Sequence, residues 1–443
     1  WIQKNKIAGF GFSREFKRFY PLFHLASHVV GFTDLDGEGL EGVERYFNEF
    51  LKGKDGYQYI AVDALGRPLN EKPLKAQMPE HGGNLVLTID SVIQNYVEEE
   101  LNRIMLHWQP KATFAVVVDV RNGKVLAMAN RPDFDPNHPA QFPTEARRNR
   151  LLTDYYEPGS TIKVFTAFGA LKAKVVTLED TFFCHYGRFQ FGPRRITDTH
   201  GYGDLSVRMI VVKSSNIGMA QIGVKLGDKK VRQNILDFGF GKKTGIELPG
   251  EVAGKVTSEK RWSFYSTTSV AMGYEIGVTA LQLAMGYSAI ANGGYLYRPT
   301  LVEKLIWNGK VVGKSRPCCV RRIYNDPQLQ KQMLSILQGV VEEGTAKRAR
   351  LSDYTMGGKT GTARRNAKGR RGYTGKYLAS FVAVAPITRP RLVVVVMTDS
   401  PKGAMYGGTV SAPAAARIMQ KSLHYLGVPP DKGKEKKDEK EKT

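Results

Sequence analysis

The sequence predicts a protein of the mixed α/β (α+β) class, in which an antiparallel sheet is flanked by helices. Apolar segments of strand length occupy residues 112–120 and 125–129, and Asn122-Gly123 between them is typical of a tight hairpin turn. Two more such segments, residues 379–385 and 392–397, lie close together near the other end of the chain. Strands joined by short connections pair in antiparallel fashion, and the helical segments between the two pairs are left to cover the sheet.

The size and charge of the chain limit its function. At 443 residues, with 42% hydrophobic residues, it is long enough for two or three globular domains. Lysine and arginine outnumber the acids 65 to 42, a net charge of +23. We expect no nucleic-acid partner, because no nucleic-acid-binding motif is evident and the charge is spread along the chain. A basic surface facing an anionic membrane or cell-wall polymer fits equally well.

Cysteines and apolar runs add two expectations. Three cysteines, two of them adjacent at Cys318-Cys319, do not make a disulfide framework. The longest purely apolar run, residues 392–397, is far shorter than the roughly 18 residues of a membrane span. The chain begins at Trp1 rather than Met, so we expect it to be a fragment without its targeting segment.

Composition divides the chain into three predicted regions. Residues 1–82 mix basic, aromatic and glycine-rich pieces and form a partial N-terminal module. Residues 83–429 carry the strands and most helices, closing with a helix over residues 411–426 that has Pro413 in its first turn. Residues 430–443 are almost entirely lysine and acid, which predicts a disordered charged tail.

Local signals place further elements in the middle region. Residues 85–89 predict a strand, after which Asp90 caps a helix whose apolar face spans residues 93–104. Thr279 and Gln282 have the spacing of a capping box, so a helix begins there.

Residues 155–163 (YYEPGSTIK) hold the first candidate site. Pro158-Gly159 predicts a turn, and an apolar helical run follows, so Ser160 falls in the first turn of a helix. Residues three apart share a helix face, and the Lys163 ammonium can therefore reach the Ser160 hydroxyl. Lysine activates serine only where burial or other cations lower its pKa. Alone, the pair is a weak signal that an N-cap serine and a solvated lysine explain as well.

Two more polar clusters follow in order. Ser206 caps a helix that breaks at Ser214-Ser215-Asn216, a break that suits a cleft but also suits a plain turn between helices. Lys359-Thr360-Gly361-Thr362 precedes a basic loop and two apolar strands, which places it at a sheet edge beside a cleft. A second Lys-Thr-Gly, beginning at Lys243, lies in a Gly/Pro-rich stretch and predicts a turn. Each of the three motifs is a weak signal alone, but Ser-x-x-Lys, Ser-x-Asn and Lys-Thr-Gly in this order form a specific signature of serine acyl-enzyme chemistry.

Three other clusters have simpler interpretations. His24 and His28 have the spacing of a metal pair on a helix, but without a third ligand we favour structural histidines. Residues 133–137 resemble a calcium loop but lack its glycine and glutamate, so we expect a turn. The charges of the basic loop predict a solvated tip: Arg364, Arg365, Lys368, Arg370 and Arg371.

With these motifs in place, the chain resembles the class B penicillin-binding proteins. The resemblance rests on EPGSTIK, SSN and GGKTGTA, with RNRLLTDYYEPGS before the first and KYLASFVAVAP after the third, and is nearest to the FtsI-type division branch. Residues 39–56 resemble the end of that family's pedestal module. Tyr274 and Ala280 depart from the family, in which many members carry Gln and Pro. The resemblance implies the penicillin-binding/serine β-lactamase-like fold.

It also implies roles for the motif residues in a peptidoglycan D,D-transpeptidase. Ser160 attacks the D-Ala-D-Ala bond of a stem peptide, Lys163 takes its proton, and Ser214 relays that proton to the leaving D-alanine. The other implied roles are amide binding by Asn216, an oxyanion hole from the N–H groups of Ser160 and Thr362, and carboxylate binding by Lys359 and the Thr360-Gly361-Thr362 segment. No metal or cofactor is implied.

The resemblance further implies partners and a cellular location, and it leaves three alternative functions open. The implied partners are stem peptides, β-lactams, a glycosyltransferase and division membrane proteins. The implied place is the outer, periplasmic face of the cytoplasmic membrane, with an anchor outside this chain and septal cell-wall synthesis as the duty. The rivals are a β-lactamase, a β-lactam sensor and a structural pseudo-enzyme. No phrase resembling the lactamase glutamate motif lies between Asn216 and Lys359, which disfavours the first.

Overall fold

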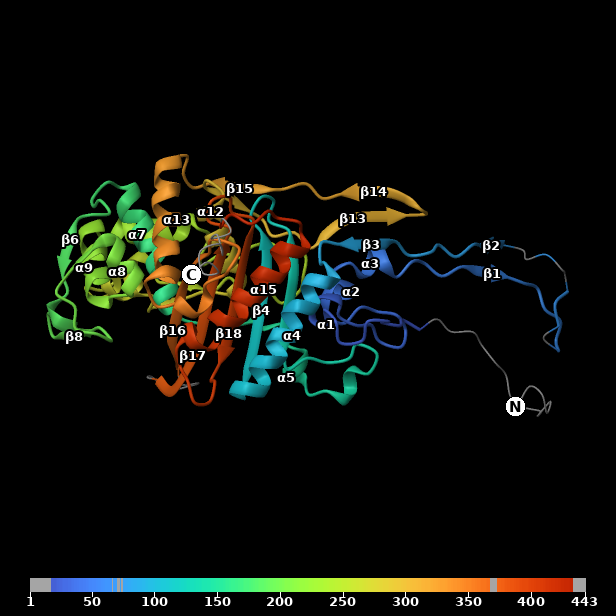
Figure 1. Cartoon of the computed structure of the whole chain (residues 1–443). Helices are drawn as coiled ribbons and strands as arrows, with labels where there is room; N and C mark the ends of the chain where they lie inside the picture. The colour runs from blue at the N-terminus through green and yellow to red at the C-terminus, as the bar shows by residue number, and fades with distance from the viewer. Residues whose placement is uncertain (1–16, 66, 70–71, 73–74, 367–372, 433–443) are drawn as a thin grey trace, which may run out of the picture.

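Figure 1 shows the computed structural model, which describes residues 17–65, 67–69, 72, 75–366 and 373–432. Its centre is a five-stranded antiparallel sheet in the order β16-β17-β18-β4-β5. The bounds of these strands are Gly357–Asn366, Tyr373–Ala385, Leu392–Asp399, Ala112–Asp119 and Val125–Arg131. The predicted antiparallel sheet with helices around it is therefore confirmed.

The central strands β4 and β18 are buried along their whole length. Successive strand residues point to opposite faces, so Val116 joins one core cluster and Val117 joins another. Helix α12 (Ala280–Ala291) covers the first face, and α4 (Ser91–Trp108) and α15 (Ala412–Tyr425) cover the second. Because both faces are covered, these strands are continuous apolar runs without the alternation of a half-exposed strand.

A group of helices fills one end of the molecule, at the left of Figure 1. Helix α7 (Lys163–Lys172) is buried for nearly its whole length and packs against several of its neighbours. The helices around it are α8 (Val207–Lys213), α9 (Asn216–Leu226), α10 (Asp228–Asp237), α11 (Ser266–Met272) and α13 (Pro327–Glu342). Helix α13 also packs on the edge strand β16, which joins this group of helices to the sheet.

The remaining elements are short. They are α1 (Ser27–Val30), α2 (Gly42–Tyr46), α3 (Asn48–Leu51), α5 (Thr144–Arg147), α6 (Arg150–Thr153), α14 (Gly407–Val410), β1 (Tyr57–Tyr59), β2 (Lys75–Gln77), β3 (Asn84–Leu87), β6 (Thr181–Phe183), β7 (Arg188–Phe191), β8 (Arg194–Thr197), β9 (Asp204–Ser206), β10 (Lys255–Val256), β11 (Ile276–Gly277), β12 (Tyr295–Tyr297), β13 (Val302–Trp307), β14 (Lys310–Lys314), β15 (Cys319–Arg322) and five 3₁₀ turns, among them η2 (Gly159–Ile162).

The N-terminal elements form an arm that is completed from a distant part of the chain. Helices α1 to α3 and the β1–β2 pair lead to β3, which pairs with β13 of the β13–β14 hairpin. The Phe50 ring lies 5.7 Å from the Trp307 ring. The strand predicted over residues 85–89 is thus β3, and it belongs to this small sheet. The boundary between the two regions at residue 82 stays a prediction. The hairpin of residues 302–314 comes from the second region in sequence but forms part of the arm, because its strand β13 pairs with β3.

The helix starts predicted at Asp90, Ser206 and Thr279 are confirmed. Asp90 accepts hydrogen bonds from two backbone N–H groups at the start of α4, and Ser206 accepts one from the start of α8 at 3.2 Å. Thr279 and Gln282 make both bonds of the capping box that opens α12. Capping partners lie within three residues of each other, which is why sequence spacing alone could identify them.

The small clusters also have the predicted structural roles. His28 is buried with Nε2 2.7 Å from the Ala146 carbonyl oxygen, and burial lowers its pKa to about 4. Asp135 accepts a hydrogen bond from the Asn137 N–H at 2.8 Å, as in a turn. Within the described ranges, no group of three or more His, Cys, Asp or Glu could hold a metal ion. None of the described helices combines the length and apolar character needed to cross a membrane.

Two expectations about charged segments need correction. The predicted tail begins too early, because the Asp431 carboxylate accepts a hydrogen bond from Thr388 at 2.6 Å and Lys432 donates to the Leu351 carbonyl oxygen at 2.8 Å. Residues 433–443 lie outside the described residues. In the basic loop, Arg365 is no solvated charge, since it pairs with the buried Asp399 at 3.0 Å. Lys368, Arg370 and Arg371 also lie outside the described residues.

Candidate active site

Ser160 lies in a tight turn just before a buried helix. The sequence predicted the first turn of an α-helix, whereas Ser160 belongs to the 3₁₀ turn η2 and α7 begins at Lys163. Gly159 has φ 53°, a conformation that favours glycine, and its N–H donates to the Gly273 carbonyl oxygen at 3.1 Å. A Cβ on Gly273 would lie 2.0 Å from the Gly159 carbonyl oxygen. Close contact with the backbone of Gly273 therefore holds the turn that carries Ser160 in place.

Lys163 is fully buried at the start of α7 and faces the break between α8 and α9. Its Nζ donates to the Ser214 carbonyl oxygen at 2.6 Å and to Asn216 Oδ1 at 2.7 Å, and it lies 3.4 Å from Ser214 Oγ. Burial lowers the pKa of Lys163 from 10.5 to about 7, against the opposing charge of Asp198. A large fraction of Lys163 is therefore an uncharged amine near neutral pH, as a general base requires.

Ser214 connects the two lysines. It ends α8 in the left-handed region at φ 63°, which turns the chain so that Asn216 can open α9. Lys359 on β16 donates to Ser214 Oγ at 2.9 Å and to the Thr360 carbonyl oxygen at 3.3 Å. Lys359 is also fully buried, and burial followed by repulsion from Lys163 holds its pKa well below the usual value. The polar tripeptide is thus a helix break that points into a cleft, and no plain turn.

The strand β16 lies directly against the Ser160 turn. A Cβ on Gly361 would lie 3.1 Å from the Pro158 carbonyl oxygen, and one on Gly159 would lie 3.5 Å from the Thr362 carbonyl oxygen. Thr360 Oγ1 lies 2.6 Å from Thr345 Oγ1. Glycine at position 361 allows this approach, because a side chain there would also collide with Ser380 Oγ. The three motifs, separated by up to two hundred residues, converge on one place.

Sequence reasoning missed Asp198, which holds the Ser-x-Asn segment in position. Its carboxylate accepts hydrogen bonds from Ser215 Oγ at 2.5 Å, from the Ile217 N–H at 3.2 Å and from the Asn216 N–H. The carboxylate therefore sits at the N-terminus of α9, where the backbone favours negative charge. Asp198 lies in a loop-rich passage and belongs to no spacing pattern, so no sequence signal identifies it.

A cleft of about 190 Å³ opens beside Asn216. Its walls come from strand β8, from Met272 at the end of α11 and Tyr274 just after it, and from Arg364 on β16. Tyr274, one of the two positions at which the sequence departs from the family, lines this cleft next to the candidate site. A substitution of Tyr274 would therefore change the wall of this cleft.

The geometry supports nucleophilic chemistry at Ser160. Among the described residues, Ser160 Oγ makes no side-chain hydrogen bond within 3.5 Å, so it is free to meet a substrate. Catalytic hydrogen bonds commonly tighten only when substrate is bound. The second Lys-Thr-Gly takes no part: Thr244 and Gly245 donate their N–H groups to the Glu251 carboxylate, at 2.7 and 3.0 Å, in a turn as predicted.

Comparison with known proteins covers almost the whole chain. Residues 113–420 match the penicillin binding protein transpeptidase domain, and residues 2–87 match the penicillin-binding protein dimerisation domain. The probable peptidoglycan D,D-transpeptidase PenA of Neisseria meningitidis is 35% identical over 96% of this chain and 71% of its own length. The peptidoglycan D,D-transpeptidase FtsI of Escherichia coli is 33% identical over 97% of this chain and 71% of its own length. Stage V sporulation protein D of Bacillus subtilis is 36% identical over 94% of this chain and 65% of its own length.

Solved structures agree with this match. Penicillin binding protein 3 of Mycobacterium tuberculosis, in complex with aztreonam, superposes with a TM-score of 0.84 at 28% identity, covering 94% of this chain and 91% of the other. A peptidoglycan synthetase from Bifidobacterium adolescentis superposes with the same TM-score at 26% identity, covering 94% and 75%.

Proposed function

We propose, from the premise that the chain belongs to the penicillin-binding protein transpeptidase family, that Ser160 is the nucleophile with which it cross-links peptidoglycan. Peptidoglycan D,D-transpeptidase activity follows from the family, because relatives of that name match over nearly the full chain. One observation carries the assignment of Ser160: a buried lysine with its pKa lowered to about 7 lies one turn away and is tied through Ser214 to a second buried lysine.

The first step is acylation. A neutral amine has two hydrogens and one lone pair, and the hydrogens of Lys163 are directed to the Ser214 carbonyl oxygen and Asn216 Oδ1. The lone pair is left for the Ser160 hydroxyl proton. Ser160 Oγ then bonds to the carbonyl carbon of the penultimate D-alanine, and the proton passes through Ser214 to the nitrogen of the leaving D-alanine as that C–N bond breaks.

The developing negative charge and the substrate carboxylate need separate partners. The backbone N–H groups of Ser160 and Thr362 form the proposed oxyanion hole, where each donor is worth about 2.7–4 kcal/mol in comparable enzymes. Lys359, with Thr360 and Thr362, binds the terminal carboxylate of the stem peptide, and Gly361 lets the strand approach. Bound carboxylate restores a positive charge on Lys359, which by repulsion keeps Lys163 neutral.

The second step transfers the acyl group. The amine of a neighbouring stem peptide attacks the acyl-enzyme carbonyl and gives up a proton to Lys163. The Ser160 ester bond then breaks, and the Ser160 oxygen takes that proton from Lys163. A β-lactam has the shape of the D-Ala-D-Ala end and leaves Ser160 acylated. This chemistry uses only side chains and backbone of the chain.

Location and organisation follow from this substrate. We place the catalytic region, residues 83–429, on the outer face of the cytoplasmic membrane, where peptidoglycan is cross-linked, and residues 1–82 as its pedestal. Support comes from the two separate domain matches. Septal duty and partnership with a glycosyltransferase and division proteins stay predictions, since relatives named for division and for sporulation match to similar extents.

Labelling with a fluorescent penicillin tests the assignment. The protein should be labelled one-to-one, and Ser160→Ala should abolish the label, whereas Ser352→Ala on the exposed surface should keep it. A label that survives Ser160→Ala would refute the nucleophile. Steady nitrocefin turnover would favour the β-lactamase, and a stable acyl adduct without cross-linking of stem peptides would favour the sensor.

A further inference from the structure

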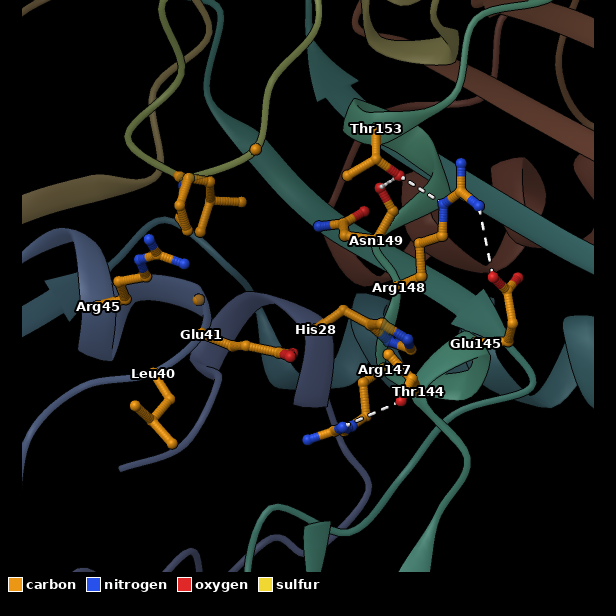
Figure 2. Close-up of a pocket in the computed structure, with 14 residues that line it drawn as sticks. His28, Leu40, Glu41, Arg45, Thr144, Glu145, Arg147, Arg148, Asn149 and Thr153 are labelled. Carbon is orange, nitrogen blue, oxygen red and sulfur yellow. Dashed lines mark hydrogen bonds and ion pairs between the residues drawn. The ribbon is translucent and has the colours of Figure 1, made fainter. Parts of the chain in front are cut away.

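The charged cavity between the N-terminal arm and the catalytic region is balanced by the chain itself. Its lining includes Glu41 and Arg45 from the arm and Arg147 from the catalytic region (Figure 2). The Glu41 carboxylate interacts with both arginines. The cavity therefore gives no reason to expect a bound anion, and a polar group with an unexplained role lies instead beside the candidate active site.

This group is the hydroxyl of Thr345, which belongs to none of the three motifs. Thr345 follows α13 in the chain, and its Oγ1 lies 2.6 Å from Oγ1 of Thr360 on β16. In the described part of the chain, neither hydroxyl makes another hydrogen bond. Thr360 is buried, with 8% of its surface exposed, whereas Thr345 is exposed. The two hydroxyls therefore form a short chain from the buried strand to the protein surface.

The turn that carries Thr345 packs against the end of α8. Lys213, the last residue of α8, donates from Nζ to the Glu343 carbonyl oxygen at 2.9 Å. A Cβ on Gly344 would lie 2.5 Å from the Val212 carbonyl oxygen, so glycine at this position allows the close approach. The helix that leads into the Ser-x-Asn motif therefore also fixes the position of Thr345.

Helix α14 makes a second contact with the same turn. A Cβ on Gly408 would lie 2.3 Å from the Thr345 carbonyl oxygen and 3.4 Å from Thr360 Cγ2. The neighbouring Gly407 donates its N–H to Thr362 Oγ1 at 3.5 Å. Two adjacent glycines of α14 thus lie against Thr345 and β16 together, and packed backbone sets the distance between the two hydroxyls.

The direction of the hydrogen bond between the two threonines decides what Thr360 offers to a substrate, because a hydroxyl has only one hydrogen to donate. If Thr360 donates to Thr345, only its lone pairs are left, and these repel a carboxylate. If Thr345 donates to Thr360, the Thr360 hydrogen stays free for the carboxylate, and the bond that Thr360 accepts strengthens the one that it donates. A bound carboxylate therefore selects the second arrangement.

We propose that Thr345 is a positioning residue for carboxylate recognition: it donates to Thr360 and so keeps the Thr360 hydroxyl directed to the terminal carboxylate of a stem peptide or β-lactam. Lys359 supplies positive charge, which attracts the carboxylate without fixing its orientation, and a directed hydroxyl adds that orientation. The role of Thr345 rests on the proposed function, since it requires the carboxylate to bind at Lys359 and Thr360.

Acylation by benzylpenicillin and by its methyl ester tests this role, because the ester keeps the ring and side chain but lacks the carboxylate charge. Thr345→Val should slow acylation by benzylpenicillin roughly tenfold, since a hydrogen bond to a charged group is weakened. It should change the slower rate with the ester less than about twofold, because the ester makes no charge-assisted bond to Thr360. Thr181→Val, which removes an exposed hydroxyl from β6, should leave both rates unchanged.

A double-mutant cycle shows whether Thr345 acts through Thr360. Thr360→Val should slow acylation by benzylpenicillin, and adding Thr345→Val should cause little further loss, because the two residues act as one unit. Additive losses, or equal losses with benzylpenicillin and its ester, would mean that Thr345 only supports the fold and would overturn the proposal. An unchanged rate in Thr345→Val would also overturn it.

Failure of this role is distinct from failure of the proposed function. In each of the outcomes above the wild type is still labelled at Ser160. A wild type that is not labelled, or a label that survives Ser160→Ala, would overturn the proposed function and the role of Thr345 with it.

Discussion

Two Lys-Thr-Gly tripeptides in this chain have the same sequence and opposite surroundings. Lys359-Thr360-Gly361 lies on the edge strand β16, where Lys359 is fully buried and bonded to Ser214 Oγ. Lys243-Thr244-Gly245 lies in a turn, where Lys243 is exposed and the backbone wraps around the Glu251 carboxylate. The same three residues therefore belong to the candidate active site in one place and to a turn in the other.

Burial and neighbouring groups, and not the tripeptide sequence, determine the charge state of each lysine. Desolvation lowers the pKa of Lys359 because its ammonium meets no carboxylate in the described chain, and Lys163 adds like-charge repulsion. In the turn, the tripeptide serves as a source of hydrogen-bond donors for one buried acid.

The largest expected effect comes from removing the lysine in each copy. Lys359→Ala should slow acylation by penicillin on the order of 10²–10³-fold, comparable to the loss of one oxyanion-hole donor, since the carboxylate loses its cation and Ser214 loses a hydrogen bond. Lys243→Ala should change the rate less than about twofold, because surface substitutions have small effects. Stopped-flow kinetics would measure the acylation rates of both variants. Equal losses in the two variants would contradict the contrast.

The second largest effect is expected at Asp198, whose negative charge acts on the buried Lys163 and holds the Ser-x-Asn segment in place. Asp198→Asn should slow acylation roughly 10–100-fold, since hydrogen bonds to a charged group are worth about 1.5–3 kcal/mol. It should also lower the pH midpoint of acylation, because Asp198 raises the pKa of Lys163. A rate loss without a shift in midpoint would leave Asp198 with a structural role only. Asp204→Asn, in the same connecting passage but exposed, is the matched control.

The pH dependence tests the buried amine directly. Lys163 has its pKa lowered to about 7 in the folded protein, so acylation should fall about tenfold per pH unit below 7 and level off above it. The sign for stability is the same: the unfolded lysine binds more protons, so stability should rise as pH increases from about 7 toward 10.5. A rate profile that is flat between pH 5 and 8 would show that Lys163 is not the base. The profile of Lys243→Ala should overlay the wild type.

The smallest effect on activity is expected in the second tripeptide. Glu251 is buried and accepts from the Thr244 and Gly245 N–H groups. Glu251→Gln should lower the free energy of unfolding by about 1–3 kcal/mol, because at least one of these donors loses its charged acceptor. Penicillin labelling of the folded variant should not change. Urea denaturation beside labelling measures both, and a loss of labelling in fully folded protein would give this turn an unexpected part in the site.

Much of the site was predictable because its parts are local. Ser160 and Lys163 are three residues apart, Ser214 and Asn216 are two apart, and the caps at Asp90 and Thr279 act within three residues. The order of the three motifs supplied the rest. The helix break at Ser214 was ambiguous, since its φ of 63° and its contacts with two distant lysines depend on the folded chain.

Other features could not be found in this way. Asp198 contacts Ser215 and Asn216 across 17 and 18 residues, with no periodicity to announce it. The β13–β14 hairpin joins β3 across more than two hundred residues. Arg365 meets Asp399 only after the sheet has formed.

Residue type and spacing along one strand or helix were enough to predict the class of fold, most helix starts and the three candidate motifs. Only the folded structure shows which Lys-Thr-Gly lies at the candidate site, why the pKa values of Lys163 and Lys359 fall, and which charges of distant segments meet. These properties arise from desolvation and from contacts between distant segments, and neither exists until the chain has folded.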